Sequence, residues 1–290
     1  MKCEKCGSEW TTNIGKTLSN CPFCGEPLAP QKAWPAVSSV PLSKPDPDGI
    51  ITFPDKALEA AVRKAAVVFS GTPLRAKDVE GITKLQYDSR PFWNVILRLD
   101  GIEHLRQLRE LDLCANKISD LSPLSGLRQL TTLNLWCNQI SDLSPLSGLR
   151  QLTELHLNNN QISDLSPLSG LSQLKELRLS FNQISDLSPL SGLRQLTKLY
   201  LDENQISDLS PLSGLHQLPY LNLDKNQISD ISPLKGLSDL RYLSLNYNPV
   251  RDLSPLDHME KLRCVEVEGT PWAKEHGKNV YRPKNRNSSL

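Results

Sequence analysis

The sequence predicts an α/β solenoid, with short parallel β-strands on one face and short helical turns on the other. The first observation is a strict 22-residue period in the position of asparagine. The repeated residues are Asn116, Asn138, Asn160, Asn182, Asn204, Asn226 and Asn248. The second is the pattern Leu-x-x-Leu-x-Leu-x-x-Asn-x-Ile around them, with Val250 in place of isoleucine in the last, in which leucines alternate just before the asparagine. A fixed period of this length is typical of stacked coils rather than a compact enzyme domain.

Each part of a repeat has a structural interpretation. Leu133 and Leu135 are two residues apart, so both point to the same side of a short strand. Five further residues are expected to close the interior of that coil: Leu127, Leu130, Ile140, Leu143 and Leu146. The asparagine is expected to bond neighbouring backbone groups in a ladder. Ser144 followed by Pro145 predicts an N-cap and a short convex helical turn. Roughly nine coils would give a parallel sheet about 40 Å long with a concave face.

The repeats and the segment before them resemble a known family. A helical pattern begins at Phe53, Asp55 can cap it, and a second short helix is expected over residues 75–79. This run resembles the N-terminal cap of bacterial internalin-type repeat proteins. The strict repeats resemble the 22-residue class of leucine-rich repeats, which internalins share with a eukaryotic phosphatase-regulatory protein. The resemblance implies a helical N-terminal cap over residues 51–81 and a leucine-rich repeat solenoid over residues 82–270.

Two Cys-x-x-Cys pairs near the N-terminus predict a metal site. Cys3 and Cys6 form one pair, Cys21 and Cys24 form the other, and 14 residues separate them. Four thiolates can surround one Zn²⁺ ion tetrahedrally, which leaves no open position for a catalytic water. Residues 1–28 therefore resemble a zinc ribbon with a structural Zn²⁺.

Three other interpretations of these cysteines remain open. A redox dithiol would need a βαβ pattern around one pair, and none is present. Iron in a four-cysteine site is chemically possible. Disulfides suit an oxidising compartment, whereas paired Cys-x-x-Cys spacing suits a reducing cytosol. Zinc is the interpretation favoured by spacing and compartment.

The segments on either side of the solenoid have distinctive compositions. Residues 29–50 are rich in proline, which predicts an extended linker that tethers the ribbon. Residues 271–290 form a basic C-terminal tail, in which Trp272 is expected to cover the end of the core. Residues 273–290 carry a net charge of +4, and we interpret them as a solvated tail; nucleic-acid contact is the alternative.

Composition argues against several function classes. The formal net charge of the chain is +1, so no bulk attraction to nucleic acid or to a membrane is expected. No run of 18 apolar residues occurs, and no apolar segment separates Met1 from Cys3. We therefore expect a cytoplasmic protein without a secretory signal or a membrane span. No nucleophile motif, phosphate loop or paired histidine ligand appears, so the chain is not expected to be an enzyme.

The repeats differ from one another mainly at residues that face outward on the strands. All six aromatic residues of positions 105–270 occupy such positions, although large side chains also tolerate a strand surface. Exposed aromatic side chains on a rigid sheet are typical of protein interfaces. Four of the six, from Phe181 to Tyr242, occur in consecutive coils and could form one diagonal stripe. The candidate partner-binding residues are Trp136, His156, Arg178, Phe181, Tyr200, Tyr220, Tyr242 and Tyr247.

Charge on the outward columns favours a particular class of partner. The four variable columns carry nine acidic and three basic residues, although the column at the strand edge adds basic ones. A mildly acidic, aromatic face suits a protein with basic or polar features rather than nucleic acid. The sequence therefore predicts a monomeric adaptor that binds a protein on the concave face. The alternatives are a nucleic-acid- or ribosome-associated protein that uses the ribbon and tail, a regulatory subunit of an enzyme, and an exported effector.

Overall fold

The structure is a computed structural model that describes residues 49–87 and 94–283. The chain divides into two compact units, Met1–Pro47 and Asp48–Leu290, and every described residue belongs to the second. The four cysteines predicted to bind zinc, and all but the last two residues of the predicted linker, lie outside the described residues. None of the described helices has the length and apolarity needed to cross a membrane.

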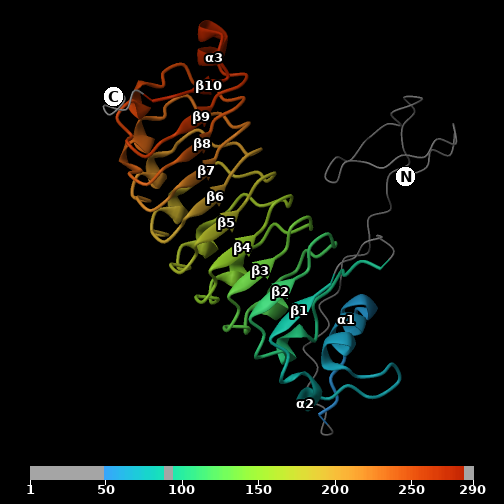
Figure 1. The fold of residues 1–290 in the computed structure, drawn as a ribbon. Helices are drawn as coiled ribbons and strands as arrows, with labels where there is room; N and C mark the ends of the chain where they lie inside the picture. The colour runs from blue at the N-terminus through green and yellow to red at the C-terminus, as the bar shows by residue number, and fades with distance from the viewer. Residues whose placement is uncertain (1–48, 88–93, 284–290) are drawn as a thin grey trace, which may run out of the picture. The chain divides into compact units, whose positions relative to one another are not determined.

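One sheet runs through the second unit in strict sequence order (Figure 1). Strands β1 to β9 pair in parallel, and β10 pairs antiparallel with β9. The strands are β1 (Lys84–Gln86), β2 (Glu110–Asp112), β3 (Thr132–Asn134), β4 (Glu154–His156), β5 (Glu176–Arg178), β6 (Lys198–Tyr200), β7 (Tyr220–Asn222), β8 (Tyr242–Ser244), β9 (Cys264–Glu266) and β10 (Val280–Tyr281). The predicted solenoid of parallel strands is therefore confirmed.

The solenoid interior is built from the leucines of the repeat. Leu133 and Leu135 are fully buried, as are the five residues predicted to close the same coil. The middle residues of β1 to β9 lie opposite one another in register, so they form one continuous apolar row. Each buried leucine contributes roughly 1.5–3 kcal/mol, which offsets chain ordering once neighbouring coils are stacked.

The predicted asparagine ladder is present. Asn138 accepts a hydrogen bond from the backbone N–H of Ile118 in the preceding coil, at 3.0 Å. Its amide donates to the carbonyls of Leu113 in that coil and Leu135 in its own, both at 3.0 Å. The same three bonds recur at Asn160, Asn182, Asn204, Asn226 and Asn248. Each asparagine thus joins two coils while satisfying backbone groups that would otherwise be buried without partners.

The helical turns form a second row, because consecutive turns contact one another. They are 3-10 helices: η1 (Ile102–His104), η2 (Ser122–Leu124), η3 (Ser144–Leu146), η4 (Ser166–Leu168), η5 (Ser188–Leu190), η6 (Ser210–Leu212), η7 (Ser232–Gly236) and η8 (Ser254–Leu256). The prediction that Ser144 is an N-cap is wrong, because Ser144 lies within η3. Asp142 supplies the acceptor instead: its Oδ1 lies 2.8 Å from the Ser144 backbone nitrogen.

Two helices, α1 (Lys56–Ala66) and α2 (Ala76–Val79), precede β1. The Asp55 carboxylate caps α1 as predicted, accepting from two backbone N–H groups of its first turn. The helix ends at Ala66, because Val67 adopts φ 56°, a left-handed conformation. Phe69 is consequently 84% exposed. Helix α1 contacts β1, and the role of residues 51–81 as a cap stays a prediction.

The C-terminal segment contains regular structure that the sequence analysis did not predict. Residues 271–283 contain α3 (Pro271–His276) and β10, which pairs along the open edge of β9. Trp272 stacks on His276 with ring centres 4.4 Å apart and meets the Tyr281 ring edge-on at 5.4 Å. An unpaired strand edge favours further pairing, and a two-residue strand is too short to recognise from sequence pattern. Residues 273–283 therefore include regular structure next to β9, while residues 274–280 are exposed to solvent.

Candidate functional site

The outward surface of the sheet is the candidate site. Here "sheet face" means the first and third residues of strands β2 to β9, together with the two residues that precede each repeat asparagine. The middle residue of every strand is buried, so its two neighbours must point away from the core. The sheet face is therefore a row of side chains held on a rigid backbone, and it is the part that varies from coil to coil.

Three tyrosines form a continuous row across β6, β7 and β8, which we call the tyrosine row. The ring centres of Tyr200 and Tyr220 lie 4.9 Å apart, and those of Tyr220 and Tyr242 lie 6.5 Å apart. The planes are tilted by 40° and 42°, which is compatible with favourable aromatic contact. Tyr242 is 45% exposed, whereas the other two are half-buried. The row thus offers a preorganised aromatic surface that stays open at its Tyr242 end.

A cation covers the other end of the tyrosine row. The guanidinium carbon of Arg178 lies 4.7 Å from the centre of the Tyr200 ring, a cation–π contact. The same guanidinium binds Glu176, with Nη2 and Nε at 2.5 and 2.6 Å from Oε1. Lys198 binds the other carboxylate oxygen of Glu176 at 2.9 Å. We call these residues and His156 the Glu176 cluster.

Burial and nearby cations shift the pKa of the Glu176 carboxyl in opposite directions. Its side chain is only 12% exposed, and burial alone would raise its pKa. Hydrogen bonds from Lys198 and Arg178 outweigh that effect, so the pKa of Glu176 is lowered. Glu176 is therefore ionised at neutral pH, with two cations paired to its single carboxylate.

His156 lies beside this pair and is partly buried, with its side chain 22% exposed. Its Nε2 atom is 3.4 Å from Glu176 Oε1, a contact that lacks hydrogen-bond geometry. Burial and the nearby Arg178 charge lower the pKa of His156. A neutral imidazole at pH 7 follows, so His156 supports the cluster by packing more than by charge.

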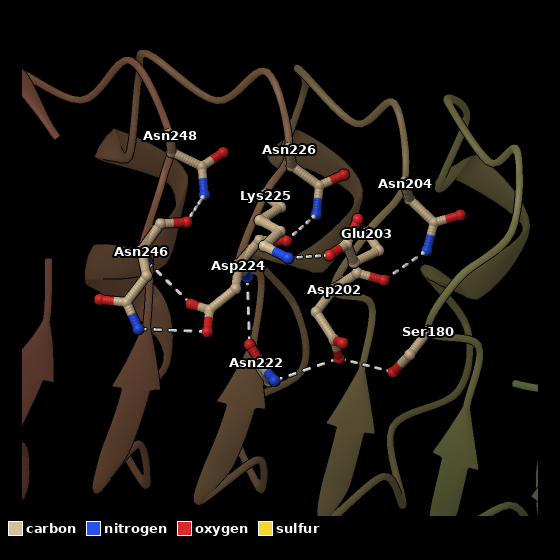
Figure 2. Close-up of polar contacts among 10 residues, drawn as sticks. All are labelled: Ser180, Asp202, Glu203, Asn204, Asn222, Asp224, Lys225, Asn226, Asn246 and Asn248. Atoms are coloured by element: carbon tan, nitrogen blue, oxygen red, sulfur yellow. Dashed lines mark hydrogen bonds and ion pairs between the residues drawn. The ribbon is translucent and has the colours of Figure 1, made fainter. Parts of the chain in front are cut away.

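The acidic residues beyond β6 have a different environment. Asp202 accepts from Ser180 Oγ at 2.5 Å and from Asn222 Nδ2 at 3.1 Å, as Figure 2 shows. Burial raises the pKa of the Asp202 carboxyl, and the nearby charges of Asp224 and Glu203 add to the rise. Its hydrogen-bond partners are neutral, so they position the carboxylate without cancelling its charge.

Asp224 is held in the same way. It accepts from Ser244 Oγ at 2.5 Å, and from the backbone nitrogen and Nδ2 of Asn246 at 2.8 and 3.2 Å. Figure 2 shows this carboxylate between the side chains of Asn222 and Asn246. Within the described residues neither Asp202 nor Asp224 forms an ion pair, whereas Glu203 pairs with Lys225. The C-terminal part of the sheet face therefore carries uncompensated negative charge.

A depression of about 130 Å³ opens beside these carboxylates. The side chains that line it include Tyr220, Asp224, Tyr242, Ser244, Cys264 and Glu266. They come from β7, the loop that follows it, β8 and β9, so three adjacent coils build one concavity. Its aromatic side is the open end of the tyrosine row, and two acidic residues line it as well.

A larger cavity of about 800 Å³ lies at the C-terminal end, next to Trp272 and Tyr281. Its lining is balanced in charge: Arg251, Asp252, Asp257, Glu275, Lys278 and Arg282. A balanced lining gives no preference for a charged ligand. The smaller depression on the sheet face is the better-defined site.

The remaining predicted residues do not join the tyrosine row. Trp136, Phe181 and Tyr247 are about half exposed and sit after the strands, on the turn that leads to each asparagine. Phe181 and Tyr247 have φ 57°, a left-handed conformation that this position adopts throughout the repeats. No ring contact within the described residues links any of the three to the row. The predicted stripe ran from Phe181 to Tyr242. Among the described residues, ring contacts join its three tyrosines and do not reach Phe181.

Several residues important to the site were not among the sequence-based candidates. Glu176, Asp202, Asp224 and Glu266 appeared only in the charge count of the outward columns. Aligning the repeats by their 22-residue period places carboxylates next to aromatic residues, and that signal would have found them. In residues 49–87 and 94–283 no cluster of three or more His, Cys, Asp or Glu could hold a metal ion. Cys137 and Cys264 are free thiols.

Comparisons with known proteins agree with this geometry. A family described as "Leucine Rich repeats (2 copies)" matches residues 128–170 and 172–214, and one described as "Leucine rich repeat" matches residues 194–250. Internalin C2 from Listeria monocytogenes is similar in structure, with 39% sequence identity and a TM-score of 0.71. The match covers 74% of this chain and 94% of that one. No curated protein sequence matches the chain.

Two further structures extend the comparison. Internalin F from Listeria monocytogenes is 34% identical with a TM-score of 0.64, over 75% of this chain and 70% of that one. The ectodomain of the Arabidopsis thaliana receptor kinase GASSHO1/SCHENGEN3, in complex with CASPARIAN STRIP INTEGRITY FACTOR 2, is 24% identical with a TM-score of 0.60. That match covers 69% of this chain and 26% of the receptor and shows the shared fold alone.

The period, the asparagine ladder and the parallel sheet define a leucine-rich repeat solenoid. With 39% and 34% identity to two internalins over most of their length, the chain belongs to the internalin-type leucine-rich repeat family. Leucine-rich repeat proteins generally mediate protein–protein interactions.

Proposed function

We propose that this chain is a non-enzymatic adaptor that binds a protein partner on the concave face of its solenoid. The observation that carries the proposal is the tyrosine row, three adjoining rings on the face that varies between repeats. A rigid sheet loses little conformational entropy on binding, and aromatic side chains supply large contact area at few rotatable bonds. Binding energy is therefore expected to concentrate on Tyr200, Tyr220 and Tyr242.

Family and chemistry support this proposal over its alternatives. The receptor kinase ectodomain of the same fold holds a bound protein factor, which is a precedent for recognition by this architecture. Uncompensated carboxylates at Asp202 and Asp224 would repel the phosphates of nucleic acid from the same surface. A regulatory subunit of an enzyme would use the same face, so it is a special case of the adaptor.

The N-terminal segment adds a second proposed element. The spacing of Cys3, Cys6, Cys21 and Cys24 supports a structural Zn²⁺ that holds residues 1–28 together, because so short a segment buries little apolar surface. Thiolate ligands persist in a reducing compartment, which is the basis for placing the chain in the cytoplasm. A protein partner is proposed for the solenoid, and the zinc ribbon is proposed as a tethered module.

Affinity capture from native lysate tests the adaptor proposal. The baits are the intact chain, a variant with Tyr200→Ala, Tyr220→Ala and Tyr242→Ala, and a Phe69→Ala control, which removes an exposed aromatic side chain outside the sheet face. We expect a protein to be retained by the intact chain and the control and lost from the triple variant, with unchanged circular dichroism. Equal capture by all three baits would contradict the proposal, and capture abolished by nuclease would favour the nucleic-acid alternative.

A further inference from the structure

The chain shows on its own surface how this sheet face holds a cation. Arg178 places its guanidinium 4.7 Å from the centre of the Tyr200 ring and 2.5 Å from a Glu176 oxygen. An aromatic ring and a carboxylate therefore act together, the ring through its quadrupole and the carboxylate through charge and hydrogen bonding. This arrangement is an internal template for recognition of an arginine side chain.

The same two kinds of group recur farther along the sheet without a cation. Tyr220 and Tyr242 line the 130 Å³ depression, and Asp224 and Glu266 line it with them. Within the described residues, no arginine or lysine forms an ion pair with either carboxylate. The depression thus contains the aromatic and anionic parts of the template but lacks the basic part.

The charge in the depression is fixed in place. Asp224 accepts from Ser244 Oγ at 2.5 Å and from Asn246, and Glu266 accepts from Asn246 Nδ2 at 3.2 Å and lies 3.2 Å from Ser244 Oγ. All of these donors are neutral, so the negative charge is held rather than cancelled. The pKa of Tyr220 is raised by burial and by its neighbours, Glu266 and Asp224 among them, which is consistent with a negative local field.

We propose that this depression binds an arginine side chain of the partner protein. The inference rests on the proposed function and names the chemistry that the partner presents. The guanidinium would stack against Tyr220 or Tyr242 while its N–H groups reach Glu266 and Asp224. Arginine suits the site better than lysine, because its planar group stacks on rings, forms paired bonds to carboxylates and is more weakly hydrated. An acidic partner segment would be repelled.

Tyrosine NMR provides a direct test, because the chain contains six tyrosines. Protein labelled only at tyrosine is titrated with N-acetyl-arginine N-methylamide, and separately with the citrulline and lysine analogues. Citrulline keeps the shape of arginine but carries no charge. We expect the Tyr220 and Tyr242 signals to shift, and Tyr87 and Tyr281 to remain still as internal controls. Kd for the arginine analogue should be roughly threefold to tenfold below that for citrulline.

Two variants locate the effect. Glu266→Gln removes one charge from an exposed side chain of the depression, and Glu154→Gln removes a matched exposed charge from β4 of the same sheet. We expect Glu266→Gln to weaken arginine binding about threefold, leaving citrulline unaffected, and Glu154→Gln to change neither. Equal affinity for arginine and citrulline, or equal sensitivity to both variants, would overturn the inference.

The two proposals fail in different ways. If a partner is captured through the tyrosine row but arginine and citrulline bind alike, the partner presents other chemistry and only this inference is wrong. If arginine binds selectively at Tyr220 and Tyr242 but capture is indifferent to the tyrosines, the arginine site stands and the adaptor proposal fails.

Discussion

Glu176 and Asp202 belong to adjacent coils of one sheet face, yet their carboxyl pKa values shift in opposite directions. Both shifts begin with burial, which raises the pKa of each. At Glu176 the hydrogen bonds from Lys198 and Arg178 more than reverse that rise. At Asp202 the main opposing contact is a neutral hydroxyl, and neighbouring acids add to the rise. Asp202 is also the more deeply buried of the two, so deeper burial and the lack of a paired cation together distinguish it from Glu176.

This difference has a functional consequence. The Glu176 cluster is complete within the chain, since its carboxylate and its cations satisfy one another. The depression beside Tyr242 has the same aromatic and anionic groups but depends on a cation from elsewhere. A repeat protein can make such a contrast simply, because the backbone of each coil is the same and only outward residues change.

The largest effect is expected when the missing cation is supplied from within the chain. Ser244→Arg places an arginine beside Tyr242, Asp224 and Glu266, much as Arg178 stands beside Tyr200 and Glu176. We expect binding of N-acetyl-arginine N-methylamide to weaken at least about tenfold, because the introduced guanidinium fills the depression and neutralises its charge. Tyrosine NMR titration measures the change.

Ser244→Gln is the matched control for this prediction, since it removes the same hydroxyl and adds a long neutral side chain. We expect it to weaken binding less than Ser244→Arg does. Equal weakening by both would mean that space, not charge, governs the depression, and the comparison with the Glu176 cluster would lose its basis.

Much of the fold could be predicted from the sequence, because each coil corresponds to one 22-residue repeat. Leu133, Asn138 and their equivalents could be assigned from spacing alone, since a strand alternates with period two and buried asparagines need partners. The strand at Val280 was missed, because two residues carry no pattern and its pairing depends on the open edge of β9. Ser144 was wrongly assigned as an N-cap, because it lies inside η3 and Asp142 accepts the hydrogen bond from its backbone N–H.

The candidate site was less accessible to sequence reasoning. Outward positions could be predicted, so Tyr200, Tyr220 and Tyr242 were found as a group. Their contacts could not, because side-chain reach decides whether residues on neighbouring strands touch. Whether Arg178 pairs with Glu176 or projects toward a partner likewise depends on rotamer geometry, and the pattern of repeats does not encode it.

Removing the anion of the complete cluster should produce the next largest effect. Glu176→Gln leaves Arg178 and Lys198 without their shared carboxylate and is expected to lower the free energy of unfolding by about 1 kcal/mol at pH 7. Because the folded pKa of Glu176 is lowered, its contribution is present above the unfolded value of 4.5 and is lost as pH falls through the folded pKa.

Urea unfolding of the two proteins between pH 3 and pH 7 measures that dependence. We expect the difference in unfolding free energy between wild type and Glu176→Gln to disappear below the folded pKa. Glu110→Gln offers a matched control, because Glu110 pairs with Lys84 at an exposed position where a smaller effect is expected. A difference that is constant with pH would show that shape rather than charge holds the Glu176 cluster together.

The smallest effect, and the one with the opposite sign, is expected at Asp202. Asp202→Asn keeps an oxygen that can accept from Ser180 and Asn222 but removes a charge that burial and Asp224 disfavour. The folded pKa lies above the unfolded value of 3.8, so the carboxylate lowers stability as pH rises through that window. The substitution should therefore raise the free energy of unfolding at pH 7, by less than about 1 kcal/mol.

This gain in the free energy of unfolding should vanish below pH 3.8, where Asp202 is protonated in both states. Loss of stability at pH 7 in the same urea series would show that the Asp202 charge is compensated after all, and the contrast between the two coils would then be wrong.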